Sequence, residues 1–255
     1  MTCNYITEYN EAIRTEKVRV GKWIKKIYSL ICEKIKSKEY FFDAEKAEKA
    51  IEYIENFCHH SKGRNDLITL ELWQKAAVSA MFGIVDENGV RIFREVFIVI
   101  ARKNGKSLFA SAIISYMAYI EDEYGQEIYC LAPKLEQANL VYDGFYQMIQ
   151  LEPELAELAK KRRSDIYISE SNTVTKPIAF NAKKSDGFNP QLVVCDELAA
   201  WQGDAGLKQY EVMKSALGSR KQPMILSIST AGYINDSIYD ELMKRSTAFL
   251  LGNSN

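Results

Sequence analysis

Gly105, Lys106 and Ser107 are the first residues of this chain whose types and spacing could do chemistry. A lysine and a hydroxyl at the start of a helix can bind phosphate oxygens and Mg²⁺, while backbone N–H groups of the preceding loop surround the phosphates. The usual pattern, G-x-x-x-x-G-K-[ST], begins with a glycine, and here Ile100 takes its place. The tripeptide alone is weak evidence. Because it stands between a strand-like apolar run and a helical pattern, we interpret it as a nucleotide-binding loop that has lost one glycine.

Asp196 and Glu197 supply the second half of that chemistry. They follow the apolar stretch "LVVC", about ninety residues after the loop. A carboxylate at the end of a buried strand can complete a Mg²⁺ site, and an adjacent glutamate can accept a proton from the water that attacks the γ-phosphate of ATP. Taken by itself, this pair could also be a strand that ends in acidic residues without a function. Together, and in the right order, the two motifs predict a site that hydrolyses ATP.

The loop "ARKNGKS" carries basic residues where other phosphate-binding loops have small ones. We expect Arg102, Lys103, Asn104 and Gly105 to surround the nucleotide. The Arg102 guanidinium could stabilise the charge that develops on the γ-phosphate, or it could bind a carbonyl or an acid and so shape the loop. The sequence leaves both roles open. Because Arg102 and Lys103 are adjacent, we expect only one of them to face the nucleotide.

The elements that must position these residues are short apolar runs, each followed by a polar or helical segment. The runs are "VFIVI", "IYCLA", "LVVC" and "MILSIS", and the helical segments are 107–120, 135–150 and 208–217. Continuous apolar runs indicate strands that are covered on both faces, as in a parallel sheet flanked by helices. The stretch "DIYISESNTVTKPIAF" alternates and carries turn signals, which predicts short antiparallel strands at one edge.

The first quarter of the chain has a helical pattern instead. Apolar residues recur every three or four positions at Val20, Ile24, Ile27, Ile31 and Ile35. "FFDAEKAEKAIEYIENFCHH" gives a second amphipathic helix, with Asp43 as its N-cap. We therefore expect a helical subdomain at residues 1–62 and an ATPase domain at residues 63–255.

The charge balance gives no global attraction to nucleic acid. The formal net charge is −1, so any contact with DNA must come from local patches. The basic patches are Lys22 with Lys25 and Lys26, the run Lys160 to Arg163, and Lys183 with Lys184. A solvated helix face is the simpler explanation of such runs, and a phosphate contact stays open.

The cysteines favour a reducing compartment. There are five, at Cys3, Cys32, Cys58, Cys130 and Cys195, and no pair has C-x-x-C spacing. The sequence Cys58-His59-His60 suggests metal ligands, but consecutive helical residues point about 100° apart and no second cluster adds ligands, so zinc is not expected. The polar start of the chain and the short apolar runs predict a cytoplasmic protein without membrane contacts.

Several segments, in one order, carry a resemblance to a known family. They are "LELWQKAAVSAMFG", "GVRIFREVFIVIARKNGKS", "IYCLAPKLEQA", "DGFNPQLVVCDELAAW" and "LSISTAGY". Together they resemble the ATPase domain of tailed-bacteriophage terminase large subunits, the motors that move DNA into capsids. The resemblance implies an α/β P-loop NTPase fold of the RecA-like, ASCE type, with a mainly parallel sheet flanked by helices, and it extends over nearly the whole chain.

The resemblance also implies roles for single residues. Gln74 would contact the adenine, with Trp73 packed beside it, although such a pair on a helix is usually only core and surface. Lys106 and Ser107 would bind phosphate and Mg²⁺, Asp196 would complete the metal site, and Glu197 would be the catalytic base. Hydroxyls of Ser229 and Thr230, at the end of the last strand, would sense the γ-phosphate and couple hydrolysis to movement.

As partners, the resemblance implies double-stranded DNA, a portal protein and a small terminase subunit. The active form would be a pentameric ring in the host cytoplasm, in which a neighbouring subunit contributes an arginine. Candidates for that arginine are Arg162, Arg163 and Arg220. The alternative is a nucleotide-gated assembly or binding module that does little hydrolysis by itself.

The chain departs from the family in two respects. Family members continue into a nuclease domain with an acidic metal cluster, and we expect no nuclease activity from these 255 residues. A histidine often follows the acidic pair in the family, whereas Leu198 and Ala199 follow it here.

Overall fold

The computed structural model describes residues 4–180, 187–232 and 237–253. Cys3, Lys183 and Lys184 lie outside the described residues. The chain divides into two compact units, which are described separately. Unit 1 comprises residues 1–55, 69–93 and 243–255, and unit 2 comprises residues 56–68 and 94–242. This division does not follow the boundary expected at residue 62, because later segments of the chain fold with the first helices.

Unit 1 is mainly helical. Its helices are α1 (Tyr5–Arg14), α2 (Lys22–Lys36), α3 (Ala44–Phe57, whose last two residues belong to unit 2) and α4 (Leu72–Gly83). Two short strands, β1 (Phe41–Phe42) and β2 (Ile84–Val85), pair antiparallel. The predicted N-cap is confirmed, since Asp43 Oδ1 accepts a hydrogen bond from Lys46 N at 3.1 Å.

The core of unit 1 comes from one face of each amphipathic helix. Ile6 and Ile13 of α1, Ile31 of α2 and Ala76 of α4 are buried together with Ile84. Helix α1 was not predicted from the sequence. Its capping residue, Asn4, accepts a hydrogen bond from Thr7 N, and its buried residues recur at helical spacing, so both signals were available.

Unit 2 is built around a seven-stranded sheet with the order β3-β9-β8-β4-β7-β6-β5. The strands are β3 (Glu95–Val99), β4 (Glu127–Ala132), β5 (Ala159–Lys161), β6 (Ile166–Ile168), β7 (Thr173–Ala179), β8 (Pro190–Asp196) and β9 (Met224–Ser229). The five strands from β3 to β7 in this order are mutually parallel, and β6 and β5 are antiparallel. The predicted mainly parallel sheet is therefore confirmed.

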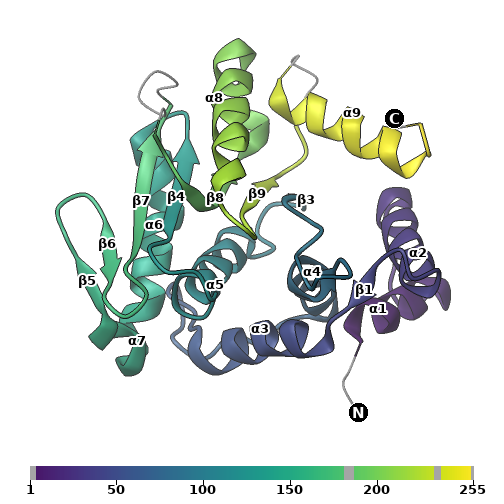
Figure 1. The fold of residues 1–255 in the computed structure, drawn as a ribbon, viewed down its shortest axis with the longest axis horizontal. Coiled ribbons are helices and arrows are strands. Elements are labelled where there is room, and N and C mark those ends of the chain that lie inside the picture. The colour runs from purple at the N-terminus through teal and green to yellow at the C-terminus, as the bar shows by residue number, and fades with distance from the viewer. Residues whose placement is uncertain (1–3, 181–186, 233–236, 254–255) are drawn as a thin grey trace. The chain divides into compact units, whose positions relative to one another are not determined.

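Helices cover both faces of this sheet (Figure 1). On one face, α5 (Lys106–Tyr119) and α6 (Leu135–Gln150) pack against the central strands. On the other face, α8 (Gly203–Ala216) and the first residues of α9 (Ile238–Leu250) contribute to a second core. The short helix α7 (Pro153–Leu158) lies between α6 and β5 in the chain and contacts both. The strands that carry the two motifs are thus buried on both faces, as their continuous apolar sequences indicated.

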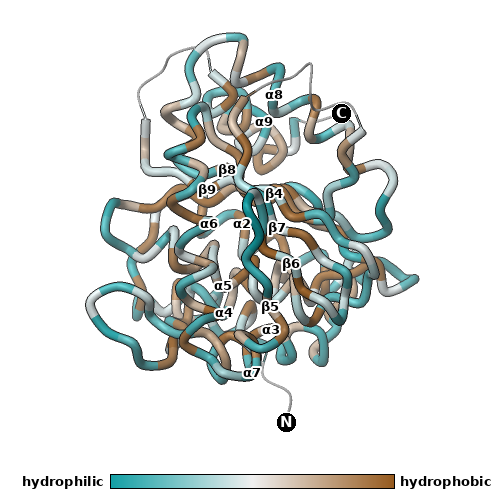
Figure 2. Tube along the Cα trace, turned by 90° about the vertical axis from the view of Figure 1, so that its left-hand side faces the viewer, coloured by the Kyte–Doolittle hydropathy of each residue, from teal (hydrophilic) through white to brown (hydrophobic). Residues whose placement is uncertain are grey.

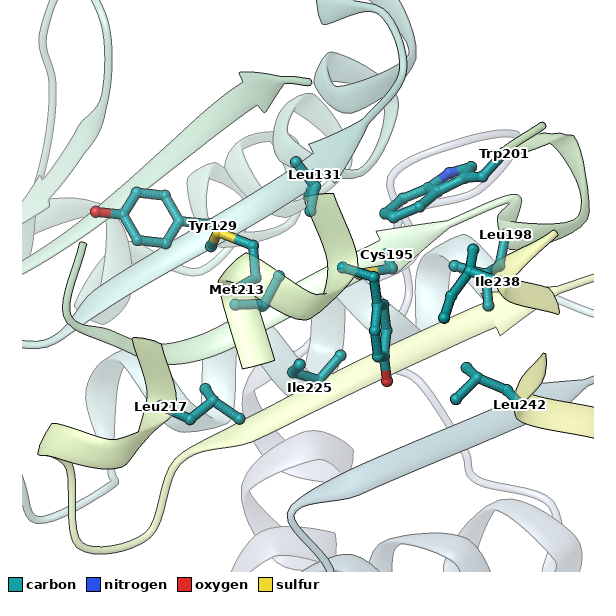
Figure 3. Packing of buried hydrophobic residues seen from close by; sticks show 12 residues of the cluster. Tyr129, Leu131, Cys195, Leu198, Trp201, Met213, Leu217, Ile225, Ile238 and Leu242 are labelled. Atoms are coloured by element: carbon teal, nitrogen blue, oxygen red, sulfur yellow. The ribbon is translucent and has the colours of Figure 1, made fainter. Parts of the chain in front are cut away.

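Alternate side chains of each strand point to the core under α8. Tyr129 and Leu131 of β4, together with Cys195 of β8 and Ile225 of β9, point to this face, because residues two apart along a strand share a face. Figure 3 shows these side chains in one cluster with Trp201, which is fully buried. The chain as a whole alternates hydrophobic and hydrophilic stretches along its trace (Figure 2). The burial of Leu198 and Trp201 in this core fixes the segment that follows the acidic pair.

Two expectations need correction. Strand β7 was expected among antiparallel edge strands, but it pairs parallel with β4 and antiparallel with β6. It therefore joins the parallel sheet to the antiparallel edge. Helix α8 begins at Gly203 rather than near residue 208. A local alternation pattern reports which residues face a core, and it does not report the direction of the neighbouring strand.

Among the described residues, no helix is long and apolar enough to cross a membrane.

Candidate nucleotide site

The carboxyl edge of the parallel sheet brings the two predicted motifs together. Strand β3 ends at Val99 and leads through the loop 100–105 into α5, which begins at Lys106. Strand β8 ends at Asp196, and β9 lies between β3 and β8 in the sheet. Parallel strands all present their carboxyl ends at the same edge, which is where open α/β sheets bind ligands. The loop and the acidic pair, ninety residues apart in sequence, therefore share one site.

The loop holds its shape without the first glycine. Lys103 and Gly105 both adopt left-handed backbone conformations, with φ of 65° and 72°. The Asn104 side-chain amide donates hydrogen bonds to the carbonyls of Ala101 at 3.1 Å and Arg102 at 3.2 Å. These bonds satisfy two loop carbonyls that lie outside any sheet or helix ladder. Asn104, rather than the Arg102 side chain, is the residue that stabilises this loop from within.

Lys106 connects the two motifs directly. Its Nζ forms a hydrogen-bonded ion pair with Glu197 Oε1 and lies 3.5 Å from Asp196 Oδ1. Ser107 Oγ lies 3.4 Å from Asp196 Oδ2. Asp196 also accepts a hydrogen bond from the Glu197 backbone N–H at 2.8 Å. The lysine thus neutralises two carboxylates where a nucleotide site would present them to phosphates and a metal ion.

Burial acts on the two oppositely charged groups in opposite directions. Burial raises the pKa of the Asp196 carboxyl above its usual value, and the nearby Lys106 charge only partly offsets this. Burial alone would lower the pKa of Lys106, but the Glu197 hydrogen bond and the Asp196 charge outweigh it, so the pKa of Lys106 is raised. Lys106 is therefore held in its charged form, the form that binds phosphate.

The backbone after β8 is unusual at Glu197. This residue has φ 52° and ψ 46°, a left-handed conformation that side chains other than glycine rarely adopt. The turn at Leu198–Ala200 follows, and Ser229 Oγ accepts a hydrogen bond from Ala199 N at 3.0 Å. Trp201 Nε1 donates to the Asp196 carbonyl at 3.1 Å. These two bonds fix the turn and direct the Glu197 side chain toward Lys106.

A cavity opens over this cluster. It is lined by Arg102, Lys103, Gly105, Lys106, Ser107, Leu108 and Glu197. Arg102 and Lys103 both line it, although the sequence suggested that only one would face a nucleotide. Their exposed cationic side chains and the charged Lys106 give the cavity a strongly basic wall, which suits a polyphosphate.

The remaining predicted residues, Thr230, Gln74 and Trp73, have contacts of their own. Thr230 directly follows β9, and its carbonyl accepts a hydrogen bond from Ser229 Oγ at 2.8 Å. Gln74 lies in unit 1, near the start of α4. There its side-chain oxygen accepts from Glu71 N at 2.8 Å, forming a capping box with Glu71. Trp73 packs against the core of unit 1.

The arginine candidates differ in what they contact. Arg220 is nearly buried, and its guanidinium donates to Asn189, to the carbonyls of Tyr124 and Gly125, and to Glu123. Arg162 pairs with Asp165 and lies over the Tyr167 ring. Arg163 is exposed beside the edge strand β5. These contacts hold Arg220 inside its own fold, so it does not suit a role in a neighbouring subunit.

The residues around Cys58 also have contacts of their own. His59 Nδ1 lies 2.8 Å from the Asn65 carbonyl, and Nε2 lies 3.1 Å from Glu152. Cys58 is buried, and burial raises the pKa of its thiol to about 12. No group of three or more His, Cys, Asp or Glu side chains suited to a metal ion occurs within the described ranges.

Comparison with known proteins identifies the family. Residues 72–247 match the family model described as "Terminase large subunit, ATPase domain". The terminase large subunit of Enterobacteria phage HK97 is 26% identical over 190 residues, which are 72% of this chain and 36% of that protein.

A solved structure shows the same fold. The crystal structure of the HK97 bacteriophage large terminase matches 79% of this chain and 41% of that one, with a TM-score of 0.68 and 23% identity. The chain thus spans less than half the length of the relatives it matches. The α/β P-loop fold expected from the motifs is confirmed by this likeness and by the sheet order. Because the family model covers more than half of its residues, the chain belongs to the family of phage terminase large subunit ATPase domains.

Proposed function

We propose that this chain binds Mg-ATP in the cavity around Lys106 and hydrolyses it, and that this hydrolysis drives double-stranded DNA into a procapsid. One observation carries the proposal. Lys106 and Ser107, at the start of the helix that follows the loop, contact Asp196 and Glu197 beside a basic cavity that Glu197 lines. A phosphate-binding lysine beside a metal-binding and a proton-accepting carboxylate is the set that ATP hydrolysis requires.

Binding of ATP would rearrange the Lys106 ion pairs. The ammonium now neutralises Glu197 and Asp196, and the β- and γ-phosphates would compete for it with more negative charge. Transfer of Lys106 to the phosphates would leave the Glu197 carboxylate without its cation. Glu197 is partly exposed, so a water can reach it. The site therefore couples arrival of the nucleotide to release of the base.

Hydrolysis then needs one proton transfer. Glu197 accepts a proton from water while the water oxygen forms a bond to the γ-phosphorus, and the bond between that phosphorus and the β–γ bridging oxygen breaks. ADP leaves with the electron pair of the broken bond, and inorganic phosphate forms. Arg102 and Lys103, which line the cavity, would stabilise the charge on the phosphate oxygens.

The oxygen donors present suit Mg²⁺. Ser107 Oγ and Asp196 Oδ2 lie 3.4 Å apart, and a hydroxyl with a carboxylate is the kind of hard oxygen set that this ion prefers. When bound, Mg²⁺ would neutralise charge on the β- and γ-phosphate oxygens. Asp196 is buried, and its carboxylate accepts a hydrogen bond from the Glu197 backbone N–H at 2.8 Å, which holds it in place for that purpose.

Roles for Gln74 and Thr230 rest on the family. We infer that Gln74 contacts the adenine through its Nε2, because its Oε1 already caps α4. The Thr230 hydroxyl, next to the turn that Ser229 fixes, would sense the γ-phosphate. A portal protein, a small terminase subunit and a ring of copies of this chain are partners that the family suggests. Arg163, the exposed candidate, is the arginine we propose for a neighbouring site.

A second function is favoured by one observation. Glu197 is paired with Lys106, so a ligand would have to draw the lysine away before Glu197 could act as a base. A nucleotide-gated binding module with little hydrolysis of its own would have the same ion pair. The two functions differ in whether bound ATP is turned over.

Lys106→Met tests the binding step, and Lys103→Met, which we expect to weaken binding less, is the matched comparison. Both changes remove one cation from the cavity, but only Lys106 touches the acidic pair. We expect Lys106→Met to weaken Mg-ATP binding by about 10- to 100-fold, because a charge-assisted hydrogen bond to phosphate is worth about 1.5–3 kcal/mol. Titration with a fluorescent ATP analogue measures this. Equal affinities for both variants and the wild type would refute the site.

A further inference from the structure

We propose that one face of α2 in unit 1 binds the phosphate backbone of duplex DNA. This α2 face consists of Lys22, Lys25, Lys26, Ser29 and Lys36. The proposal rests on the proposed function, since it names the surface by which the motor domain holds the DNA it moves. It goes beyond that function because the nucleotide site lies on residues of unit 2.

The lysines of the α2 face share one side of the helix. At 100° per residue, positions 22, 25, 26, 29 and 36 lie within about 60° of one direction. Ile31 points the opposite way and Tyr28 points to one side, and both are buried in the core of unit 1. Lys22, Lys25, Lys26 and Lys36 are all exposed. The helix thus presents an exposed face with four lysines and one acid, Glu33, while its other side holds it to the fold.

The net charge of α2 and its flanking residues differs strongly from that of the whole chain. Residues 15–38 contain eight lysines and arginines and two glutamates, a net charge of +6 in a protein whose net charge is −1. Elsewhere in unit 1, lysines such as Lys46 and Lys75 are paired with carboxylates. Within the described part of the chain, the four lysines of the α2 face have no carboxylate partner. Their field is therefore available to an external anion.

The charges at the start of α2 are unfavourable for the helix itself. A helix N-terminus carries partial positive charge and favours acids, yet the first turn of α2 contains no acid. Its cap is Gly21, which has no side chain to accept from the backbone N–H groups. Lys22, Lys25 and Lys26 add three like charges at three- and four-residue spacing, which also disfavours the helix. An anion bound there would relieve both kinds of repulsion.

A shallow hollow lies over these residues and gives an anion a place to bind. It is lined by Lys22, Lys25, Lys26, Ser29, Leu30, Glu33 and Leu250, all of unit 1. Glu33, the one acid of α2, accepts a hydrogen bond from Ser29 Oγ at 3.1 Å. The Lys22 ammonium lies 4.6 Å from the centre of the Trp23 ring, a cation–π contact that fixes it at the end of the face. The hollow combines three lysines, a hydroxyl and a helix start.

Duplex DNA fits the length and chemistry of this face. Lys22 and Lys36 are separated by about 21 Å along the helix axis, at 1.5 Å per residue. One DNA strand places a phosphate about every 3.4 Å along its axis, so the face spans about six phosphates. Lysine ammonium groups bind phosphates as point charges and carry no base-reading geometry. Such contacts hold DNA of any sequence, as a packaging motor requires.

Duplex binding by the triple variant Lys22→Gln, Lys25→Gln, Lys26→Gln tests the proposal. The matched control replaces Lys49, Lys208 and Lys221, which are exposed and scattered, and has the same change in net charge. Fluorescence anisotropy with a 30-base-pair duplex gives Kd over a series of salt concentrations. We expect the α2 variant to bind about tenfold or more weakly at 0.1 M salt and to lower the slope of log K against log salt by about three, one per lost phosphate contact.

Each outcome decides between two possibilities. Loss of duplex binding in the α2 variant but not in the control, with Mg-ATP affinity and DNA-free hydrolysis unchanged, supports the proposal. Equal duplex binding by the two variants overturns it, and so does a wild type that binds no duplex at low salt. Binding of vesicles with anionic lipid, lost in the α2 variant while duplex binding persists, would assign the face to membranes and also overturn it. Failure of the proposed ATPase function appears separately, as absent hydrolysis in all three proteins.

Discussion

Glu197 holds a left-handed backbone conformation, and a strained residue next to proposed chemistry has a physical reason to exist. A backbone at φ 52° and ψ 46° would be relaxed in glycine, but glycine has no carboxylate. The surrounding contacts, Trp201 Nε1 to the Asp196 carbonyl and Ala199 N to Ser229, are what hold the strained turn. Strain of this kind persists when the structure around it determines the conformation. At the scale of one residue, the fold gives up stability to direct the carboxylate that we propose as the base.

This account predicts an unusual order of stability at position 197. Glu197→Gly and Glu197→Ala both lose the carboxylate and its pairing with Lys106, so they differ only in the backbone. Glu197→Gly should be the more stable by about 1 kcal/mol, because alanine is disfavoured in the left-handed region. Urea unfolding of both variants measures the difference in free energy.

The control is the same pair of changes in a regular helix. Lys208 is exposed in α8, where glycine should be the less stable variant by about 1 kcal/mol. If glycine is less stable at both positions, Glu197 is not strained and the argument from its backbone fails.

At the amino ends of β4 and β8, opposite the candidate site, Arg220 joins the two segments that precede these strands. Its guanidinium joins the segment before β8, through Asn189, to the turn before β4, through Tyr124, Gly125 and Glu123. Five donors in a planar fork suit these acceptors, and lysine has no such fork. Arg220 therefore helps to hold the parallel strands β4 and β8 in register, although it lies far along the chain from both segments that it contacts.

Arg220→Ala should lower the free energy of unfolding by about 3 kcal/mol, since it leaves Glu123 and two carbonyls without their donor. Arg220→Lys should lie between this variant and the wild type. Thermal and urea unfolding check both values. Arg163→Ala is the matched control, because Arg163 is exposed, and we expect it to change stability by less than about 0.5 kcal/mol. Similar stability of the Arg220 and Arg163 variants would mean that Arg220 does not hold these strands.

Which elements the sequence could predict depends on where their partners lie. Strands β3, β4, β8 and β9 were predicted because both of their faces are buried, which leaves continuous apolar runs. The direction of β7 was not predicted, because its parallel pairing with β4 is set by the crossover through α6 rather than by the residues of β7. The contacts of Arg220, a candidate arginine for a neighbouring subunit, were missed for the same reason, since its acceptors lie 31 and 95 to 97 residues earlier in the chain.

For the whole molecule, the candidate site follows from two local motifs that a parallel sheet must bring to one edge. That inference needed only the apolar runs and the residues that end them. The contact between Lys106 and Glu197 could not be read from the sequence, because it depends on how α5 and the turn after β8 are placed. The capping role of Gln74 could have been found, since Glu71 and Gln74 have capping-box spacing. Family membership adds the expectation of DNA packaging to this geometry.

The most direct test of the central claim is phosphate release by wild type and Glu197→Gln, each saturated with Mg-ATP as judged from its own binding titration. Glutamine keeps the size of the side chain and can still accept a hydrogen bond from Lys106, but it cannot accept a proton from water. We predict that both proteins bind Mg-ATP with similar affinity and that the variant releases phosphate about 10²- to 10⁴-fold more slowly, the usual contribution of a general base. Equal rates of phosphate release would contradict the role of Glu197 and the account of this site as an ATP-hydrolysing one.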